Sequence, residues 1–136
     1  MEQATEERLG AAIHAVDGGA VTTEKIVLAV RQIVALANPV RVVAFGSRAR
    51  GDHRPDSDLD LAVIVDRYDP KIDPRPVWRS DLDVWMPVDI LVAGTERHEF
   101  LKQSIISVHH DIAAEGVTLY DRSVGSIDQG AVERVA

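Results

Sequence analysis

The 136-residue chain contains no cysteine, which excludes disulfide bonds and thiolate metal sites. No apolar run approaches the roughly 18 residues that span a membrane, and no signal peptide is visible, so we expect no membrane contact and a cytoplasmic location. Basic residues are outnumbered, because 15 Lys and Arg stand against 22 Asp and Glu, and the net charge is −7. This balance argues against general nucleic-acid binding, which normally requires a basic face.

What the chain does contain is typical of one soluble globular domain. Hydrophobic residues make up 46% and charged residues 27%, and 136 residues are enough for one hydrophobic core. We expect a single domain over residues 1–136, with its core at about 22–120. Residues 1–21 are expected to form an N-terminal helix, at about 3–16, followed by a loop. The tail at 121–136 has little periodicity, so we expect it to be loose or to dock on a partner.

Apolar periodicity predicts alternating helices and strands, and hence an α/β (α+β) fold. A helix is expected from the Thr22–Thr23 cap to Asn38, because Pro39 disfavours helix in the residue before it. The other core elements are expected at 40–45 (strand), 47–50 (helical turn), 59–65 (strand), 84–92 (strand), 95–116 (helix) and 117–120 (strand). Pro87 favours an edge position, a bulge or a late start for the third strand.

The helix expected after Thr95 carries a stripe of apolar residues that we interpret as core-facing. The stripe consists of Leu101, Ile105, Val108 and Ile112. His109 and His110 are adjacent in the same helix, so their side chains point about 100° apart. That angle disfavours a shared metal ion, and we interpret both histidines as surface residues.

Two aspartates one residue apart, Asp58 and Asp60, lie at the start of the strand expected at 59–65. Side chains at positions i and i+2 of a strand project to the same face, so two like charges would repel each other there. A divalent cation removes that repulsion, and Mg²⁺ favours one or two carboxylates together with substrate phosphates. The pair is therefore a candidate metal site, although an isolated Asp-x-Asp is more often a hydrated strand start.

The tetrapeptide Ser57–Asp60 is repeated in the chain as Ser80–Asp83, so the motif alone is not specific. Only the first copy has a Gly-Ser pair eleven residues upstream and a long apolar strand after it, whereas the residue eleven before Asp81 is Pro70. We therefore assign the chemistry to the first copy and interpret the second as a loop or a helix start.

The Gly46-Ser47 pair follows a strand and opens a short helical turn. Glycine allows a phosphate to approach the backbone, and a helix N-terminus presents free N–H groups to an anion. The Ser47 hydroxyl can add a donor, and Arg48 or Arg50 can neutralise phosphate charge. These four residues are therefore candidate nucleotide and phosphate ligands, although an ordinary strand-to-helix turn is the simpler interpretation of the pair by itself.

The Gly46-Ser47 turn, ten further residues, Asp58-x-Asp60 and a later strand aspartate, Asp89, together resemble the nucleotidyltransferase superfamily typified by DNA polymerase β. Within it, Gly-Ser-Arg-Ala-Arg-Gly in a short chain is similar to the minimal nucleotidyltransferases, over about residues 22–120. The resemblance implies a small mixed β-sheet flanked by helices. It also implies that Asp58, Asp60 and Asp89 are the catalytic, metal-binding carboxylates, with Asp83 as the alternative to Asp89.

The resemblance further implies a metal-dependent enzyme that uses two Mg²⁺ ions and a nucleoside triphosphate, with ATP expected as the donor. Many minimal nucleotidyltransferases are antitoxins paired with a HEPN-domain ribonuclease toxin, which some inactivate by transferring AMP to a tyrosine. We therefore expect a HEPN-domain partner protein and a hetero-oligomer.

Two alternatives remain. The enzyme could modify a small molecule such as an aminoglycoside, although such enzymes usually carry an additional helical domain. The chain could also be a non-catalytic antitoxin that inhibits its partner by binding alone.

Overall fold

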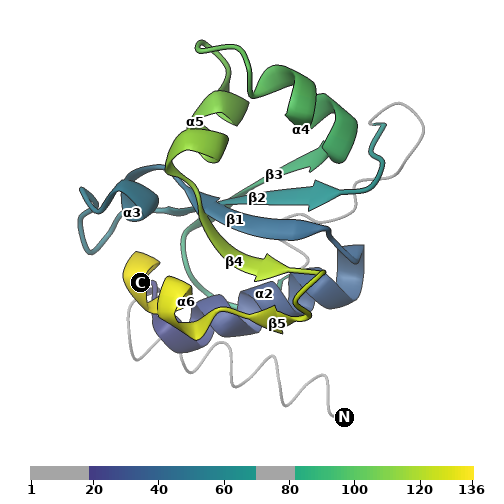
Figure 1. The fold of residues 1–136 in the computed structure, drawn as a ribbon. Coiled ribbons are helices and arrows are strands. Elements are labelled where there is room, and N and C mark those ends of the chain that lie inside the picture. The colour runs from purple at the N-terminus through teal and green to yellow at the C-terminus, as the bar shows by residue number, and fades with distance from the viewer. Residues whose placement is uncertain (1–18, 70–81) are drawn as a thin grey trace.

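The structure of the chain is a computed structural model that describes residues 19–69 and 82–136 (Figure 1). The helix predicted at 3–16 lies outside these residues. Over the described ranges, every helix is too short or too polar to cross a membrane. The elements, in chain order, are α2 (Thr23–Ala37), β1 (Arg41–Phe45), α3 (Ser47–Arg50), β2 (Leu59–Val65), β3 (Val88–Gly94), α4 (Thr95–Leu101), α5 (Val108–Glu115), β4 (Val117–Asp121), β5 (Ser126–Ile127) and α6 (Gln129–Val135).

The strands form one mixed sheet in the order β3-β2-β1-β4-β5. β1 runs antiparallel to both β2 and β4, β4 and β5 are antiparallel, and β2 and β3 are parallel. The predicted class, a small mixed sheet flanked by helices, is therefore confirmed. β3 is an edge strand that begins directly after Pro87, as expected for a residue that cannot donate a backbone hydrogen bond to a neighbouring strand.

The first described helix has the boundaries that its end residues dictate. The Thr22 hydroxyl accepts a hydrogen bond from the Lys25 backbone N–H at 3.3 Å, which satisfies one of the free donors at the start of α2. At the other end, Asn38 adopts a left-handed conformation with φ of 45°, and Pro39 follows it. The predicted helix and its cap are thus confirmed.

Helices α2 and α6 cover one face of the sheet, and α4 and α5 cover the other (Figure 1). The core between the sheet and α2 and α6 is large and apolar. Ile26 and Ile33 of α2 and Val132 of α6 are fully buried there against residues of β1, β2 and β4. The core beneath α4 and α5 is small, and Ile112 of α5 packs there against Ile64 of β2. Most of the stabilising burial therefore lies on the α2 face.

The prediction of one helix over 95–116 is wrong, because α4 ends at Leu101 and α5 begins at Val108. The Ser107 hydroxyl accepts a hydrogen bond from the His109 backbone N–H at 3.1 Å and caps α5. Serine favours such caps over helix interiors because its hydroxyl competes for backbone groups. The break leaves Ile105 80% exposed and so removes it from the expected core-facing stripe. Nor does Thr95 cap α4, since Gly94 precedes the helix as its cap and the Thr95 hydroxyl bonds to Val65.

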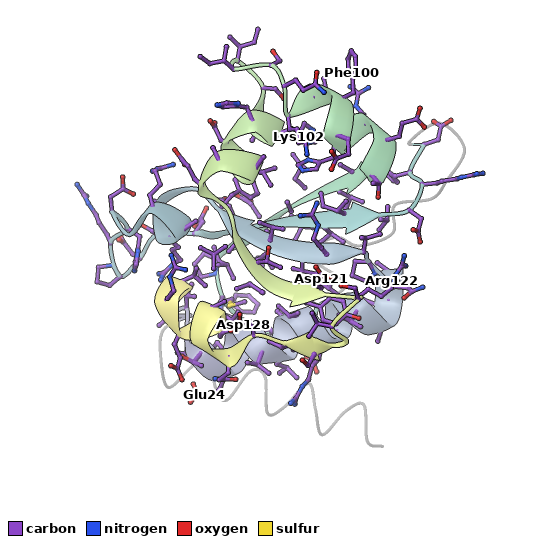
Figure 2. All side chains as sticks on the ribbon, viewed as in Figure 1. Glu24, Phe100, Lys102, Asp121, Arg122 and Asp128 are labelled. Carbon is purple, nitrogen blue, oxygen red and sulfur yellow. The ribbon has the colours of Figure 1, made fainter. Side chains whose placement is uncertain are left out.

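The prediction of a loose tail after Asp121 is also wrong, because the chain continues into β5 and α6. Asp128 caps α6 by accepting a hydrogen bond from the Ala131 backbone N–H at 3.1 Å (Figure 2 labels Asp128). The buried face of α6 consists of Ala131, Val132 and Val135. Seven residues carry too few turns for a helical period to stand out in the sequence, so the prediction missed a helix whose stability comes from packing.

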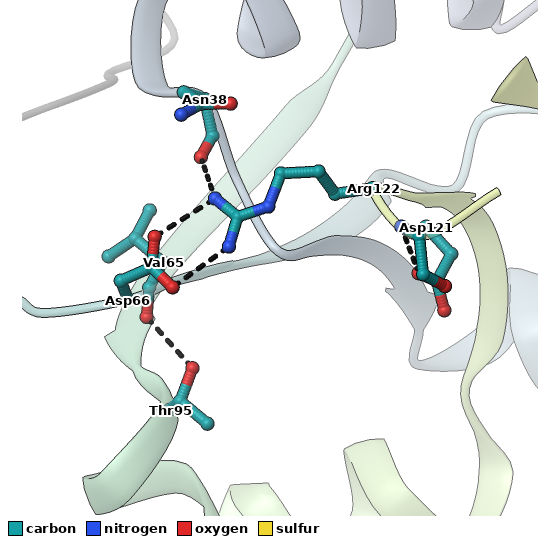
Figure 3. A network of polar contacts seen from close by, with 7 residues as sticks. Asn38, Val65, Asp66, Thr95, Asp121 and Arg122 are labelled. Carbon is teal, nitrogen blue, oxygen red and sulfur yellow. Dashed lines mark hydrogen bonds and ion pairs between the residues drawn. The ribbon is translucent and has the colours of Figure 1, made fainter. Parts of the chain in front are cut away.

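An ion pair joins the residues that follow β2 and β4 (Figure 3). It lies at the opposite end of these strands from Asp60. The Arg122 guanidinium donates to both carboxylate oxygens of Asp66, each at 2.9 Å, and to the Asn38 carbonyl at 3.2 Å. Beside it, the Thr95 hydroxyl donates to the Val65 carbonyl at 3.1 Å. These contacts fix the chain where β2 ends and α4 begins.

Candidate active site

The candidate active site is built on one row of residues across the sheet. Asp60 of β2 is paired with Phe45 of β1 on one side and with Asp89 of β3 on the other. Side chains of laterally paired residues project to the same face, so the two carboxylates lie side by side on the α4/α5 face. Asp58 immediately precedes β2 and is exposed. The fold therefore brings together three aspartates that are as many as 31 positions apart in the sequence.

The electrostatics of Asp60 show that the three carboxylates interact. Burial raises the pKa of the Asp60 carboxyl above its ordinary value of 3.8, and the negative charges of Asp89 and then Asp58 raise it further. Arg50 acts in the opposite direction. A site in which one half-buried carboxylate faces two others is electrostatically unfavourable by itself, and a bound cation would relieve it.

Gly46 brings the turn into contact with Asp60. Its φ of 75° lies in the left-handed region that glycine adopts without strain, and it caps α3. A Cβ added at Gly46 would lie 3.2 Å from the Asp60 Cγ and closer still to its Oδ2. Only glycine therefore lets the turn that carries Ser47 approach the carboxylate, and the Gly-Ser turn and the Asp-x-Asp pair form one site.

Arg50 is the cation at the edge of this site. Its guanidinium donates to Asp52 at 3.2 Å and to Glu115 of α5 at 3.3 Å, and its side chain is 44% exposed. Exposed ion pairs of this kind contribute little to stability, so a phosphate can replace these contacts at little cost. Glu115 had no signal in the sequence, because only the fold brings α5 to α3.

Arg48, the other arginine of the turn, is buried. It is 3% exposed, and its guanidinium donates to four backbone carbonyls. A group with four donors already engaged and little exposed surface is poorly placed to bind phosphate. Of the two arginines in the turn, the structure therefore leaves Arg50 exposed near Asp60 and encloses Arg48.

The arrangement of the aspartates suits a metal ion that is coordinated partly by water and substrate oxygens. Over residues 19–69 and 82–136, no group of three or more His, Cys, Asp or Glu side chains is placed so that it could hold a metal ion by itself. Mg²⁺ commonly uses one or two carboxylates and completes its coordination with water and substrate phosphates. Adjacent Asp60 and Asp89, with Asp58 nearby, fit that pattern of a site completed by a bound triphosphate.

The second Ser-Asp-Leu-Asp copy lies elsewhere. Of its residues, Ser80 and Asp81 fall outside the described ranges. Leu82 is buried in the core beside α2, and the Asp83 backbone N–H donates to the Gln32 side chain of α2 at 2.8 Å. Asp83 thus lies beside α2, whereas Asp89 lies beside Asp60 on the face of the candidate site. Leu82 and Asp83, the two described residues of this copy, lie in no helix or strand.

A buried histidine pair lies between the two helices on the same face. His98 of α4 and His109 of α5 are 3% and 7% exposed, and their Nδ1 atoms lie 2.9 Å apart. The interpretation of His109 as a surface residue is therefore wrong, because the break before Ser107 turns α5 back against α4. One ring must donate and the other accept, so the contact requires at least one neutral imidazole.

Comparison with known proteins is consistent with this geometry. A family model described as nucleotidyltransferase domain matches residues 23–121, which is most of the chain. The match includes the Gly46-Ser47 turn and all three aspartates and ends at β4, before α6. Searches of curated proteins and of solved structures gave no match.

Proposed function

The chain belongs to the nucleotidyltransferase domain family, and on that premise we propose that it transfers AMP from ATP to a hydroxyl of a HEPN-domain ribonuclease toxin and thereby neutralises it. A tyrosine hydroxyl is the proposed acceptor. The observation that carries the transferase activity is the row of Asp60 and Asp89 beside the Gly46-Ser47 turn. The acceptor and the partner rest on the resemblance to the minimal nucleotidyltransferases.

In the proposed reaction, the residues of the site position charge and move one proton. Asp89 is exposed and can accept the proton of the acceptor hydroxyl. The hydroxyl oxygen then bonds to the α-phosphorus, the bond from that phosphorus to the β-phosphate oxygen breaks, and pyrophosphate leaves. The Ser47 hydroxyl, the turn amides and Arg50 would hold the departing phosphates. Asp58, Asp60 and Asp89 would hold two Mg²⁺ ions, which neutralise charge on the triphosphate.

A cluster of exposed apolar side chains supports a protein acceptor. Phe100, Ile105, Ile106 and Val108 are 74%, 80%, 94% and 40% exposed, and we call these four residues the α4–α5 ridge. Phe100 projects away from the sheet in Figure 2. Large apolar side chains left in water favour association with a partner. The ridge lies on α4, α5 and the connection between them. These segments cover the face that carries Asp60 and Asp89, so a protein bound there would approach the site from the same side.

Intact-mass measurement of the partner protein tests the proposal. We expect the partner to gain one AMP unit after incubation with this chain, ATP and Mg²⁺, and to lose its ribonuclease activity in parallel. Asp58→Asn with Asp60→Asn should abolish the mass gain. Asp83→Asn is the matched control, because it alters the same tetrapeptide in the copy beside α2, and it should leave the mass gain unchanged.

Three results would contradict the proposal. A partner protein whose mass is unchanged after incubation with this chain, excess ATP and Mg²⁺ would exclude protein adenylylation. Full inhibition of the toxin by the Asp58→Asn/Asp60→Asn variant would show a non-catalytic antitoxin that acts by binding. Transfer of AMP to an aminoglycoside in the absence of any protein acceptor would show a small-molecule enzyme.

A further inference from the structure

Arg48 is enclosed where three segments of the chain meet. Its Nε donates to the Ser57 carbonyl at 3.0 Å, and its Nη2 donates to the carbonyls of Pro55 at 3.1 Å and Arg54 at 3.5 Å. Its Nη1 donates to the Val135 carbonyl at 3.2 Å. Three of these acceptors belong to the loop 51–58, which ends at Asp58, and the fourth belongs to α6.

Burying a guanidinium requires such a set of acceptors. A cation removed from water is strongly destabilising unless its donors are satisfied, and here four N–H groups reach carbonyl oxygens. The loop that they hold has no helix or strand of its own between Gly51 and Asp58. Within it, the Ser57 N–H donates to the Arg54 carbonyl at 3.0 Å and the Arg54 N–H donates to the Ser57 hydroxyl at 2.8 Å. Arg48 adds three hydrogen bonds that hold this turn to α3.

We propose that Arg48 is a positioning residue: its buried guanidinium fixes the backbone of loop 51–58 that presents Asp58, and it couples the order of that loop to helix α6. The assignment of Asp58 as a functional carboxylate rests on the proposed function, whereas the loop order and its coupling to α6 rest on the hydrogen bonds alone. α6 lies outside residues 23–121, which the family model matches.

The planar guanidinium allows Arg48 to donate hydrogen bonds to loop 51–58 and to α6 at the same time. Arginine presents five N–H donors in a fixed fork, whereas lysine carries three donors on a single tetrahedral nitrogen. Arg48→Lys keeps the positive charge near Asp58 but cannot reach carbonyls of both the loop and α6. The substitution therefore separates a role in geometry from a role in charge, such as a phosphate contact.

Hydrogen exchange and metal binding test the proposal in the Arg48→Lys variant. We expect the amides of residues 52–58 to exchange about tenfold faster than in the wild type, with β1 and β2 unchanged. We expect Mn²⁺ to bind about tenfold more weakly in the absence of nucleotide, since supporting contacts commonly change metal affinity by this factor. Arg134→Lys is the control, because Arg134 is an exposed arginine of α6, and it should change neither quantity.

A second variant tests the coupling without touching Arg48. Asp128→Ala removes the N-cap of α6 and should accelerate exchange in both α6 and residues 52–58. Ser107→Ala removes the comparable N-cap of α5, which makes no hydrogen bond to Arg48, and should accelerate exchange in α5 alone.

The proposal is overturned by any of three results. These are unchanged exchange at 52–58 in Arg48→Lys, exchange that rises equally throughout the chain, and loop exchange that stays at the wild-type rate in Asp128→Ala. None of these measurements requires nucleotidyl transfer. A chain that transfers no AMP but shows the expected exchange would contradict the proposed function and leave the role of Arg48 intact.

Discussion

The two faces of the sheet are built for different purposes. The α2 face buries a continuous set of aliphatic side chains from α2, α6 and four strands. The α4/α5 face has a small apolar core, two carboxylates paired across adjacent strands, a buried histidine pair and the exposed α4–α5 ridge. One face carries most of the stability, and this allows the other to hold groups that are unfavourable for folding. Four predictions test this division, from the largest expected effect to the smallest.

Asp60→Asn should affect chemistry and stability in opposite directions. We expect AMP transfer to fall by on the order of 10³-fold or more, because one of the carboxylates proposed to hold the Mg²⁺ ions is lost. The melting temperature of the metal-free protein should rise, since burial and the charges of Asp89 and Asp58 disfavour ionised Asp60 at neutral pH. Calorimetry in the presence of a chelator measures the shift, with Asp83→Asn as the control that should leave both quantities unchanged. A lower melting temperature would show that ionised Asp60 stabilises the fold.

An Ile→Ala substitution should lower the free energy of unfolding more on the α2 face than on the α4/α5 face. Ile33→Ala of α2 should lower the free energy of unfolding by about 3–4 kcal/mol, because it leaves a cavity in a fully enclosed site. Ile112→Ala of α5 should cost about 2 kcal/mol, since the small core around it can collapse more easily. Urea denaturation measures both values. Equal decreases in the free energy of unfolding would mean that the two cores contribute equally to stability.

The histidine pair should make the α4/α5 face sensitive to acid. Burial lowers the pKa of His98 below its ordinary value of 6.5, and His109, Arg41 and Lys102 lower it further against the opposing charge of Glu99. Burial, with Arg97, likewise lowers the pKa of His109.

The unfolded chain therefore takes up protons first as the pH falls, and the free energy of unfolding should decrease below about pH 6.5. Urea titrations from pH 7.5 to 5.5 measure the slope, which should be shallower in His98→Gln. His110→Gln should retain the wild-type slope because His110 is outside the pair. An unchanged slope in His98→Gln would mean that the pair does not govern the acid response.

Ile106→Ser should have the smallest effect on the isolated chain. Ile106 is 94% exposed, so its replacement should change the free energy of unfolding by less than about 0.5 kcal/mol. It should nevertheless weaken the complex with the partner protein, as measured by titration calorimetry. Leu36→Ser is the control, because Leu36 is 53% exposed on α2 on the opposite face. Equal weakening by both variants would remove the α4–α5 ridge as the docking surface.

Local signals in the sequence predicted the elements that have strong periods and clear ends. α2 lies between the Thr22 cap and Asn38, and β1, α3, β2 and β4 lie within one residue of their expected bounds. Pro87 correctly indicated a late start at the sheet edge. The residues before β3 do alternate, with Val84 and Met86 buried and Trp85 exposed, but the strand itself begins only at Val88.

The errors occurred where the sequence pattern had more than one solution. A stripe from Leu101 to Ile112 fits one long helix, yet Ser107 begins a new helix and two isoleucines remain in solvent. The tail after Asp121 has no strong period, yet α6 is held by burial of Val132 and Val135. Helices this short are stable only through tertiary contacts, which a local pattern does not contain.

The sequence by itself predicted the nucleotidyltransferase superfamily, through the resemblance of its motifs, and the mixed α/β class, through its apolar periodicity. It also indicated Asp58 and Asp60 as the candidate carboxylates. Only the tertiary structure showed that Asp89 lies in register with Asp60 whereas Asp83 lies beside α2. It also separated Arg50, exposed near the carboxylates, from Arg48, enclosed among four carbonyls. The physical reason is that burial and hydrogen-bond partners come from distant segments, and two arginines two residues apart are equivalent until those segments are in place.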